Sequence, residues 1–330
     1  MKAIALLSGG LDSIVAIKLI KEQGIDVIAL NFTSPFCTCT KKGSTCSSAA
    51  LAAKQLNVPL KVIAKGMDYF KIVENPKFGY GSAMNPCIDC RIYLMKKAKE
   101  VMQEEGASFI ISGEVVGQRP MSQQKHTLRC IEKEAGVEDI LLRPLSAKLL
   151  PETLPERMGW VDRNKLLAIN GRGRKEQMEI ATKSSIDYPC PAGGCLLTDK
   201  NIAKRLKDLF EHKKNYTLDD IKLLKIGRHI RVTPKTKVIV ARNEEEGKKL
   251  SSFFNSNQDV LINCVQPKGA AVLIKDFDGL LDDELLSIVY RYSDAADGEK
   301  LVIEADGVIK DNLSISGSVL SESQIQEMII

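Results

Sequence analysis

The sequence predicts an α/β fold: an open parallel sheet with helices on both faces, of the Rossmann-like kind, followed by a smaller α/β C-terminal domain. Short apolar runs rich in β-branched residues recur through the first 150 residues, and stretches of helical periodicity separate most of them. Apolar strands that alternate with helices are typical of a parallel sheet covered on both sides. A turn-rich stretch at 185–200 then indicates two domains, 1–200 and 201–330.

The predicted elements follow one another in a regular order. Five apolar runs are the expected strands of the first domain: IALL (4–7), DVIALNF (26–32), LKVIA (60–64), SFIISGE (108–114) and DILLRPL (139–145). Helical periodicity is clearest in three stretches: 11–23, 46–56 and 89–105. The second domain is expected to begin with a basic helical run and to continue with strands in DVLINCV, AAVLIKDF and KLVIEADGVI around a helix in DGLLDDELLSIVYRY.

Composition narrows the class of protein. A hydrophobic fraction of 44% and a charged fraction of 27% are ordinary for a soluble globular chain. Since no apolar stretch approaches the ~18 residues of a membrane span, we expect no membrane association and a cytoplasmic location. The chain has 9 cysteines. In a reducing compartment such cysteines are more often metal ligands or reactive thiols than structural disulfides.

The turn SGGLDS connects the first predicted strand to the first predicted helix. Gly9 and Gly10 let backbone N–H groups approach a phosphate closely, at a helix N-terminus that favours negative charge. The hydroxyls of Ser8 and Ser13 can donate further hydrogen bonds. Asp12 would repel a bare phosphate, so we expect it to help hold Mg²⁺ or to orient a reacting group. The simpler alternative is a strand–turn–helix connection in which Asp12 only caps the helix.

The complete string resembles the pyrophosphate loop of the PP-loop ATP pyrophosphatases. The resemblance implies cleavage of ATP to AMP and pyrophosphate, with residues 8–10, 12 and 13 binding ATP. In that superfamily the end of the second strand recognises adenine, which points to Asn31 and Phe32 here. By the same analogy, Gly113 and Glu114 lie close to the α-phosphate.

Cysteine placement indicates a branch of the superfamily. The segment MNPCIDC puts Cys87 and Cys90 at the start of a helix, where a thiolate is favoured. This segment resembles the Asn-Pro-x-x-x-Cys segment of tRNA 2-thiouridine synthases, which have a second essential cysteine after a later Gly-rich turn. Cys195, in PAGGCLLTD, occupies that place. One departure is that Cys87 stands where some of those synthases have an aspartate.

The resemblance implies two sulfur chemistries. Synthases with only a cysteine pair use a persulfide and a disulfide, whereas related tRNA thiolases hold a [4Fe-4S] cluster on three thiolates, here Cys87, Cys90 and Cys195. A zinc site is the runner-up, with Cys190 as fourth ligand. A second group of cysteines is left open as a metal site, a sulfur relay or an ordinary loop: Cys37, Cys39 and Cys46. Cys130 and Cys264 lie in apolar contexts and are expected to be buried.

Charge is distributed unevenly along the chain. Basic residues outnumber acidic ones in 201–250 and acidic ones dominate 251–330, which favours a surface polarised toward a polyanion. We predict RNA contacts by six residues: Arg172, Arg174, Lys204, Lys207, Lys213 and Lys214. The region 201–275 also resembles an RNA-binding module of ribosome-quality-control proteins. A solvated helix face is the alternative interpretation.

Together these resemblances imply an ATP-dependent tRNA thiolase that adenylates a uridine carbonyl oxygen and then displaces AMP with sulfur. The expected catalytic residues are Asp12, Cys90 and Cys195, and the expected cofactors are ATP, Mg²⁺ and the cluster. The expected partners are tRNA, a sulfur donor (sulfide or a persulfide carrier) and a second copy of the chain in a homodimer. Two alternatives are a PP-loop enzyme that adenylates a small molecule and a catalytically inactive RNA-binding metalloprotein.

Overall fold

The computed structural model describes residues 1–37, 47–188, 195–277, 281–296, 299–306, 308–313 and 320–330. The chain divides into two compact units, Met1–Asp199 and Lys200–Ile330. Within the described ranges, none of the helices combines the length and the apolar character that a membrane span requires.

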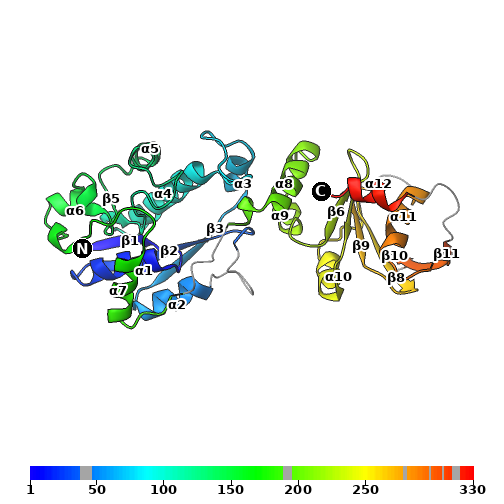
Figure 1. Ribbon diagram of the computed structural model, residues 1–330, viewed down its shortest axis with the longest axis horizontal. Helices are drawn as coiled ribbons and strands as arrows, with labels where there is room; N and C mark the ends of the chain where they lie inside the picture. Colours follow the sequence, from blue (N-terminus) through cyan, green and yellow to red (C-terminus); the bar gives the residue numbers. More distant parts are fainter. Residues whose placement is uncertain (38–46, 189–194, 278–280, 297–298, 307, 314–319) are drawn as a thin grey trace. The chain divides into compact units, whose positions relative to one another are not determined.

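The N-terminal unit is built on a five-stranded parallel sheet in the order β3-β2-β1-β4-β5 (Figure 1). The strand order reverses between β1 and β4, and in open α/β sheets ligands bind at the carboxyl ends of the strands beside such a reversal. The predicted open parallel sheet is confirmed, although two of its strands are shorter than predicted. The strands are β1 (Lys2–Leu6), β2 (Asp26–Thr33), β3 (Leu60–Ala64), β4 (Phe109–Ile111) and β5 (Leu141–Leu142).

Helices cover both faces of this sheet because successive residues of each strand point to opposite sides. Ala3 and Ala5 of β1 pack with α1, α2 and α7, whereas Ile4 packs with α4 and α5. The helices are α1 (Leu11–Lys21), α2 (Ser47–Gln55), α3 (Met67–Glu74), α4 (Cys87–Glu104), α5 (Lys125–Ala135), α6 (Leu154–Arg157) and α7 (Lys175–Lys183). Three short 3₁₀ turns complete the described part of this unit: Ala147–Leu149, Arg163–Lys165 and Leu196–Thr198.

The C-terminal unit contains a six-stranded antiparallel sheet in the order β11-β10-β8-β9-β7-β6. One face packs against α11 and α12, and the other against α9 and α10 (Figure 1). The strands are β6 (Arg228–Arg231), β7 (Lys237–Val240), β8 (Val260–Gln266), β9 (Val272–Lys275), β10 (Leu301–Ala305) and β11 (Val308–Leu313). The helices are α8 (Lys200–His212), α9 (Leu218–Leu223), α10 (Glu244–Ser251), α11 (Asp283–Arg291) and α12 (Glu322–Glu327).

The predicted basic helical run forms two helices rather than one. Thr217 caps α9, since its hydroxyl accepts a hydrogen bond from the Asp220 N–H while the Asp220 carboxylate accepts one from the Thr217 N–H at 2.8 Å. This reciprocal capping starts a new helix and separates α9 from α8.

Candidate active site

The SGGLDS loop turns tightly between β1 and α1. Gly9 has φ +79°, and a Cβ there would lie 2.7 Å from the carbonyl carbon of Ser48, so only glycine fits. Gly10 is the N-cap of α1 and has no side chain to cover the helix N-terminus. The Ser13 hydroxyl donates to the Gly10 carbonyl at 2.8 Å and lies 3.2 Å from the Ser8 hydroxyl. The loop therefore leaves an open helix N-terminus with two hydroxyl groups beside it.

The neighbouring strand ends support this loop. A Cβ on Gly113 would lie 2.7 Å from the backbone nitrogen of Ser13, so the chain after β4 runs directly against the start of α1. At the end of β2, the buried Asn31 amide donates to the Leu7 carbonyl at 2.7 Å and ties β2 to the strand that enters the loop. Phe32 packs partly buried on the α4 side of the sheet. Adenine recognition by this strand end stays a prediction.

Asp12 is held by two amide groups that the sequence analysis did not identify. Its Oδ2 accepts a hydrogen bond from Gln118 Nε2 and its Oδ1 accepts one from Gln177 Nε2, each at 3.2 Å. Gln177 is fully buried, and its Oε1 has no hydrogen-bond partner among the described residues. The Arg174 guanidinium lies 3.9 Å from Asp12 Oδ2. Asp12 is thus oriented by fixed donors and faces a positive charge.

Pairing between two distant segments explains how α7 reaches the loop. Asn170 pairs in parallel with Val116 just beyond β4, and the Gly171 N–H donates to the Val116 carbonyl at 2.8 Å. Gly117 has φ +75°, and a Cβ there would lie 2.8 Å from Asn170 Oδ1. This junction places the start of α7 beside α1. Arg174, predicted from sequence as an RNA contact, therefore lies next to the phosphate loop.

Arginine side chains make the surroundings of the loop positive. Burial raises the pKa of Glu114, but Arg143 and Arg91 bring it below its ordinary value, with the Arg143 Nε 3.0 Å from Glu114 Oε2. Glu114 is thus an ionised partner of two arginines. Desolvation and the charges of Arg91 and Arg174 lower the pKa of Arg119. Clustered guanidinium groups are suited to binding a polyphosphate.

Cys90 lies in a polar environment one turn into α4. The Lys65 ammonium is 3.3 Å from its Sγ and 4.2 Å from the centre of the Tyr69 ring. Burial raises the pKa of Cys90, but the Lys65 charge and a hydrogen bond from Tyr69 bring it below its ordinary value. A depressed pKa gives the thiolate that a nucleophile requires. Lys65, at the end of β3, was not predicted as a site residue.

Cys195 lies on the same side of the site as Cys90. The Met84 N–H donates to the Leu197 carbonyl at 3.1 Å and ties this segment to the chain that enters α4. Burial raises the pKa of Cys195, and the neighbouring Cys90 raises it further. These two predicted cysteines are therefore brought together. Burial also raises the pKa of Cys87, against the lowering effects of Arg91 and Arg119.

The arrangement of the cysteines bears on the metal site that the sequence predicts. Among the described residues, no group of three or more His, Cys, Asp and Glu side chains is arranged to hold a metal ion. The described part of the site therefore shows no preassembled set of ligands for the cluster or zinc ion that the sequence analysis expects. Several predicted residues lie outside the described ranges: Cys39, Cys46 and Cys190. Cys130 and Cys264 are partly exposed rather than fully buried.

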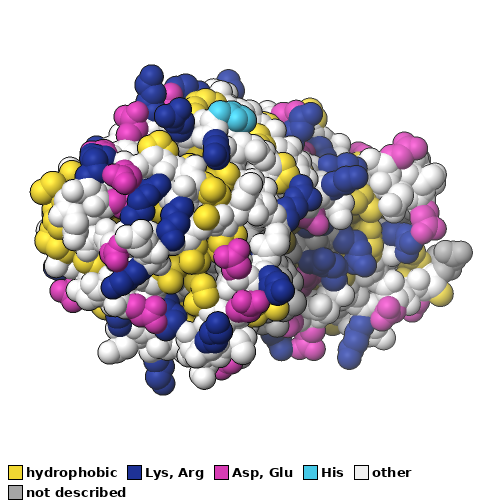
Figure 2. Space-filling view, turned by 60° about the vertical axis from the view of Figure 1, so that its left-hand side comes forward, with side chains coloured by type: hydrophobic (Ala, Val, Ile, Leu, Met, Phe, Trp, Pro, Cys, Tyr) yellow, Lys and Arg dark blue, Asp and Glu magenta, His cyan; other side chains and the backbone are white. Residues whose placement is uncertain are grey.

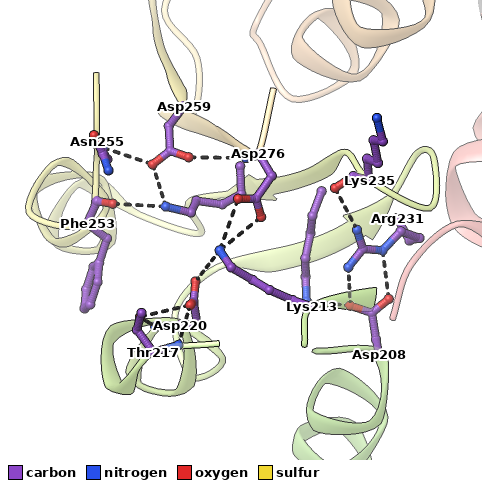
Figure 3. A network of polar contacts seen from close by, with 12 residues as sticks. Asp208, Lys213, Thr217, Asp220, Arg231, Lys235, Phe253, Asn255, Asp259 and Asp276 are labelled. Carbon is purple, nitrogen blue, oxygen red and sulfur yellow. Dashed lines mark hydrogen bonds and ion pairs between the residues drawn. The ribbon is translucent and has the colours of Figure 1, made fainter. Parts of the chain in front are cut away.

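The predicted RNA-contacting lysines differ in their surroundings. Lys204, Lys207 and Lys214 are exposed, and the first two lie on one face of α8. Lys213 is instead held between Asp220 and Asp276, at 3.2 and 3.1 Å (Figure 3). Burial lowers its pKa, but these two carboxylates raise it above its ordinary value. In Figure 2, Lys and Arg side chains gather on the visible face of the C-terminal unit, on the right of the view.

The parallel sheet and the SGGLDS loop at its strand-order reversal define a PP-loop domain. Residues 1–148 match the family model described as "Thiamine biosynthesis protein (ThiI)", and residues 227–329 match "NFACT protein RNA binding domain". The N-terminal unit is thus similar to the first family over most of its length, and the C-terminal unit is similar to the RNA-binding domain family.

Similar proteins cover the chain to different extents. The tRNA-specific 2-thiouridylase MnmA of Clostridium acetobutylicum is 27% identical over 299 residues, which are 77% of this chain and 80% of that protein. The probable tRNA sulfurtransferase of Methanothermobacter thermautotrophicus is 28% identical over 163 residues, 49% of this chain and 41% of that protein. The chain thus spans less than half the length of the second relative.

Two solved structures show low similarity to this chain. A 4-thiouridine synthetase in complex with RNA and bound ATP is 20% identical, with 68% of this chain and 52% of that chain covered and a TM-score of 0.37. The U34-tRNA thiolase NcsA from Methanococcus maripaludis, with its [4Fe-4S] cluster, is 18% identical, with 68% and 73% covered and a TM-score of 0.33.

Proposed function

We propose that this protein catalyses the ATP-dependent thiolation of a uridine in tRNA. The observation that carries the proposal is a direct link between the loop and α4: Arg91, next to Cys90, lies 3.5 Å from Glu114, and the adjoining Gly113 packs against the backbone of Ser13. The phosphate-binding loop and the C-x-x-C helix then belong to one site, as a reaction that couples adenylation to sulfur transfer requires. The relatives named as tRNA 2-thiouridylase and tRNA sulfurtransferase support the same reaction.

In the adenylation step, the loop binds the phosphates of ATP. The N–H groups at the start of α1 and the hydroxyls of Ser8 and Ser13 hydrogen-bond to the phosphate oxygens, while Arg174 and Arg119 neutralise the charge that develops on the departing pyrophosphate. Asp12, oriented by its two amide donors, is the residue that would hold Mg²⁺. When bound, Mg²⁺ supplies Lewis-acid stabilisation of the phosphate charge.

In the sulfur-transfer step, Cys90 and Cys195 act as a pair. One of them carries a persulfide whose outer sulfur attacks the adenylated carbon and expels AMP. The other thiolate then attacks the inner sulfur, which releases thiouridine and leaves a Cys90–Cys195 disulfide. The ammonium of Lys65, 3.3 Å from Cys90 Sγ, stabilises the negative charge on sulfur. The outer sulfur of the persulfide comes from a persulfide carrier, which passes its outer sulfur atom to the cysteine thiolate and leaves as a thiol.

Iron analysis distinguishes this route from the cluster that the sequence predicts on Cys87, Cys90 and Cys195. We expect anaerobically purified protein to contain well below one iron atom per chain and to keep Cys90 and Cys195 open to alkylation. A brown protein with about four iron atoms per chain, lost in Cys87→Ser, would support the cluster instead. Stoichiometric zinc that protects these thiols would equally contradict the persulfide route.

For RNA binding, we propose that tRNA phosphates contact the exposed lysines of the C-terminal unit. Replacing Lys204, Lys207 and Lys214 together with Glu should weaken tRNA binding at least about tenfold at moderate salt and flatten its salt dependence, because fewer counterions are released. Filter binding across a salt series measures both effects.

The control for this prediction changes the charge by the same amount elsewhere in the same unit. Lys222, Lys248 and Lys249 are also exposed, and each pairs with an acid of its own helix. Their replacement with Glu should leave tRNA affinity within about threefold of that of the unmodified protein. Equal losses from both triple variants would mean that net charge, and not this face of α8, determines binding.

A small-molecule substrate is the alternative within the same ATP chemistry. The two reactions differ in what triggers ATP cleavage. A tRNA thiolase should form AMP at a rate that rises with added tRNA and falls after ribonuclease treatment. If AMP forms equally fast without RNA, the tRNA substrate is wrong and a small acceptor is favoured.

A further inference from the structure

Cys37 lies directly opposite Cys195 in the N-terminal unit. The two residues form an antiparallel bridge, and the Leu196 N–H donates to the Phe36 carbonyl at 3.0 Å. Because this hydrogen bond joins flanking residues, the cysteines are a non-hydrogen-bonded pair, in which Cα atoms are about 4.5 Å apart and side chains lie closest. A disulfide bridges Cα atoms about 4.4 to 6.8 Å apart. The backbone therefore suits a bond between these two sulfurs.

Buried neighbours hold both cysteines in this arrangement. Phe36 is 1% exposed and packs edge-on against Phe70, with ring centres 5.9 Å apart. The Cys37 N–H donates to the Ser34 carbonyl at 3.0 Å. On the other side, Leu197 is fully buried. The juxtaposition of the two thiols thus follows from packing on both sides of the bridge.

Cys90 is the third thiol of this group. Its neighbour Lys65 lies 4.2 Å from the centre of the Tyr69 ring, and Tyr69 packs against Phe70 with ring centres 5.5 Å apart. Phe70 in turn contacts Phe36, the residue before Cys37. Burial raises the pKa of Tyr69, and so do the charges of all three cysteines. Cys90 differs from the other two because the Lys65 ammonium lies 3.3 Å from its sulfur. A thiolate stabilised in this way is the best leaving group of the three in thiol–disulfide exchange.

We propose that Cys37 is a resolving cysteine that exchanges with the Cys90–Cys195 disulfide, forming a Cys37–Cys195 disulfide and freeing Cys90. This inference rests on the proposed sulfur-transfer reaction. The Cys37 thiolate attacks Cys195 Sγ, the Cys90–Cys195 bond breaks, and Cys90 leaves with the electron pair as a thiolate beside Lys65. The proton of Cys37 passes to solvent, and no net oxidation occurs. An external dithiol then reduces the Cys37–Cys195 disulfide and is itself oxidised to a disulfide, which readies the site for another turnover.

Disulfide mapping on the full chain tests the proposal without requiring tRNA. Anaerobically purified protein is oxidised with oxidised glutathione, free thiols are alkylated, and the linked peptides are identified by mass spectrometry under non-reducing conditions. We expect Cys37–Cys195 as the main link in the unmodified protein and also in Cys90→Ser. In Cys37→Ser, Cys195 should instead be linked to Cys90. A main Cys90–Cys195 link in the unmodified protein, or no link to Cys195, would overturn the proposal.

Two matched variants control for cysteines that share the same tryptic peptides. Cys39→Ser and Cys190→Ser each remove a neighbouring thiol and should leave the Cys37–Cys195 link in place. If the link disappears in either variant, the disulfide involves the removed cysteine, and the proposal is contradicted.

A turnover measurement adds a kinetic readout. With tRNA, ATP, a persulfide sulfur source and a dithiol reductant, Cys37→Ser should form about one thiouridine per chain and then slow at least about tenfold, because the Cys90–Cys195 disulfide accumulates. Continued turnover at the rate of Cys39→Ser would overturn the resolving role. If the unmodified protein forms no thiouridine, the proposed function fails, whereas the disulfide map still decides the pairing of Cys37.

Discussion

Asp12→Asn is expected to slow the cleavage of ATP to AMP and pyrophosphate by at least about 100-fold, the size of effect seen when one preorganised charge-stabilising group is removed from an active site. Asparagine keeps the size of the side chain but loses the negative charge that would hold Mg²⁺ and that faces Arg174, 3.9 Å away. The fold should be preserved, because Asp12 is only partly buried in the first turn of α1 and its printed contacts are polar. Release of pyrophosphate in the presence of tRNA measures the effect.

A suitable control is Asp26→Asn, which makes the same chemical change at an exposed position. Asp26 begins β2 and therefore lies at the amino end of the sheet, opposite the loop. Its replacement should leave the rate of pyrophosphate release within about twofold of that of the unmodified protein. Pyrophosphate release by Asp12→Asn at the unmodified rate would remove Asp12 from the mechanism.

Cys195→Ser is expected to abolish thiouridine formation while pyrophosphate release continues. A serine hydroxyl can neither carry a persulfide nor form a disulfide, so the sulfur-transfer step has no substitute group. The ATP-binding loop does not depend on this residue, and adenylation, which releases pyrophosphate, should therefore persist. Liquid chromatography of tRNA nucleosides and a pyrophosphate assay on the same reaction measure the two steps separately.

Cys130→Ser controls for the general effect of removing a thiol from this unit. Cys130 is a partly exposed residue of α5 and should have no role in sulfur transfer. This variant should form thiouridine at a rate close to that of the unmodified protein. Thiouridine formation by Cys195→Ser at more than a few per cent of that rate would contradict the assigned role of Cys195.

The parallel sheet and the loop could be predicted because each rests on a local pattern. Apolar runs of β-branched residues indicate buried strands wherever they occur, and the SGGLDS string lies within a single strand–turn–helix. The strands of the C-terminal unit were also visible as apolar runs. The order of these strands in the sheet could not be predicted. Antiparallel partners such as β7 and β9 are separated by α10 and β8, and no local signal pairs them.

The polar residues of the site were harder to predict because they arrive through tertiary contacts. Gln177 reads as an ordinary residue of an amphipathic helix, and only the pairing of Asn170 with Val116 brings it to Asp12. Lys65 follows a strand like many surface lysines. The positions of both residues could have indicated a site. Lys65 lies at the carboxyl end of a predicted strand and Gln177 lies at the start of a helix, and α/β sheets bind ligands at such places.

Cys37 shows the limit of spacing arguments. Its separation from Cys39 and Cys46 matches no specific metal motif, and its partner across the bridge lies far away in the sequence. The structure pairs it with Cys195, the residue that the family resemblance had already singled out. A loop cysteine thereby comes to lie beside the proposed sulfur-transfer site, where the Leu196 N–H donates a hydrogen bond to the Phe36 carbonyl.

The central claim is tested most directly by incubating purified protein and unmodified tRNA with Mg²⁺, ATP and a small persulfide whose outer sulfur is ³⁴S, and analysing the tRNA nucleosides by mass spectrometry. We predict a thiouridine that carries ³⁴S, formed together with AMP in equal amounts and absent when ATP is omitted. AMP formation without any labelled thiouridine, or labelled thiouridine without ATP, would contradict the account.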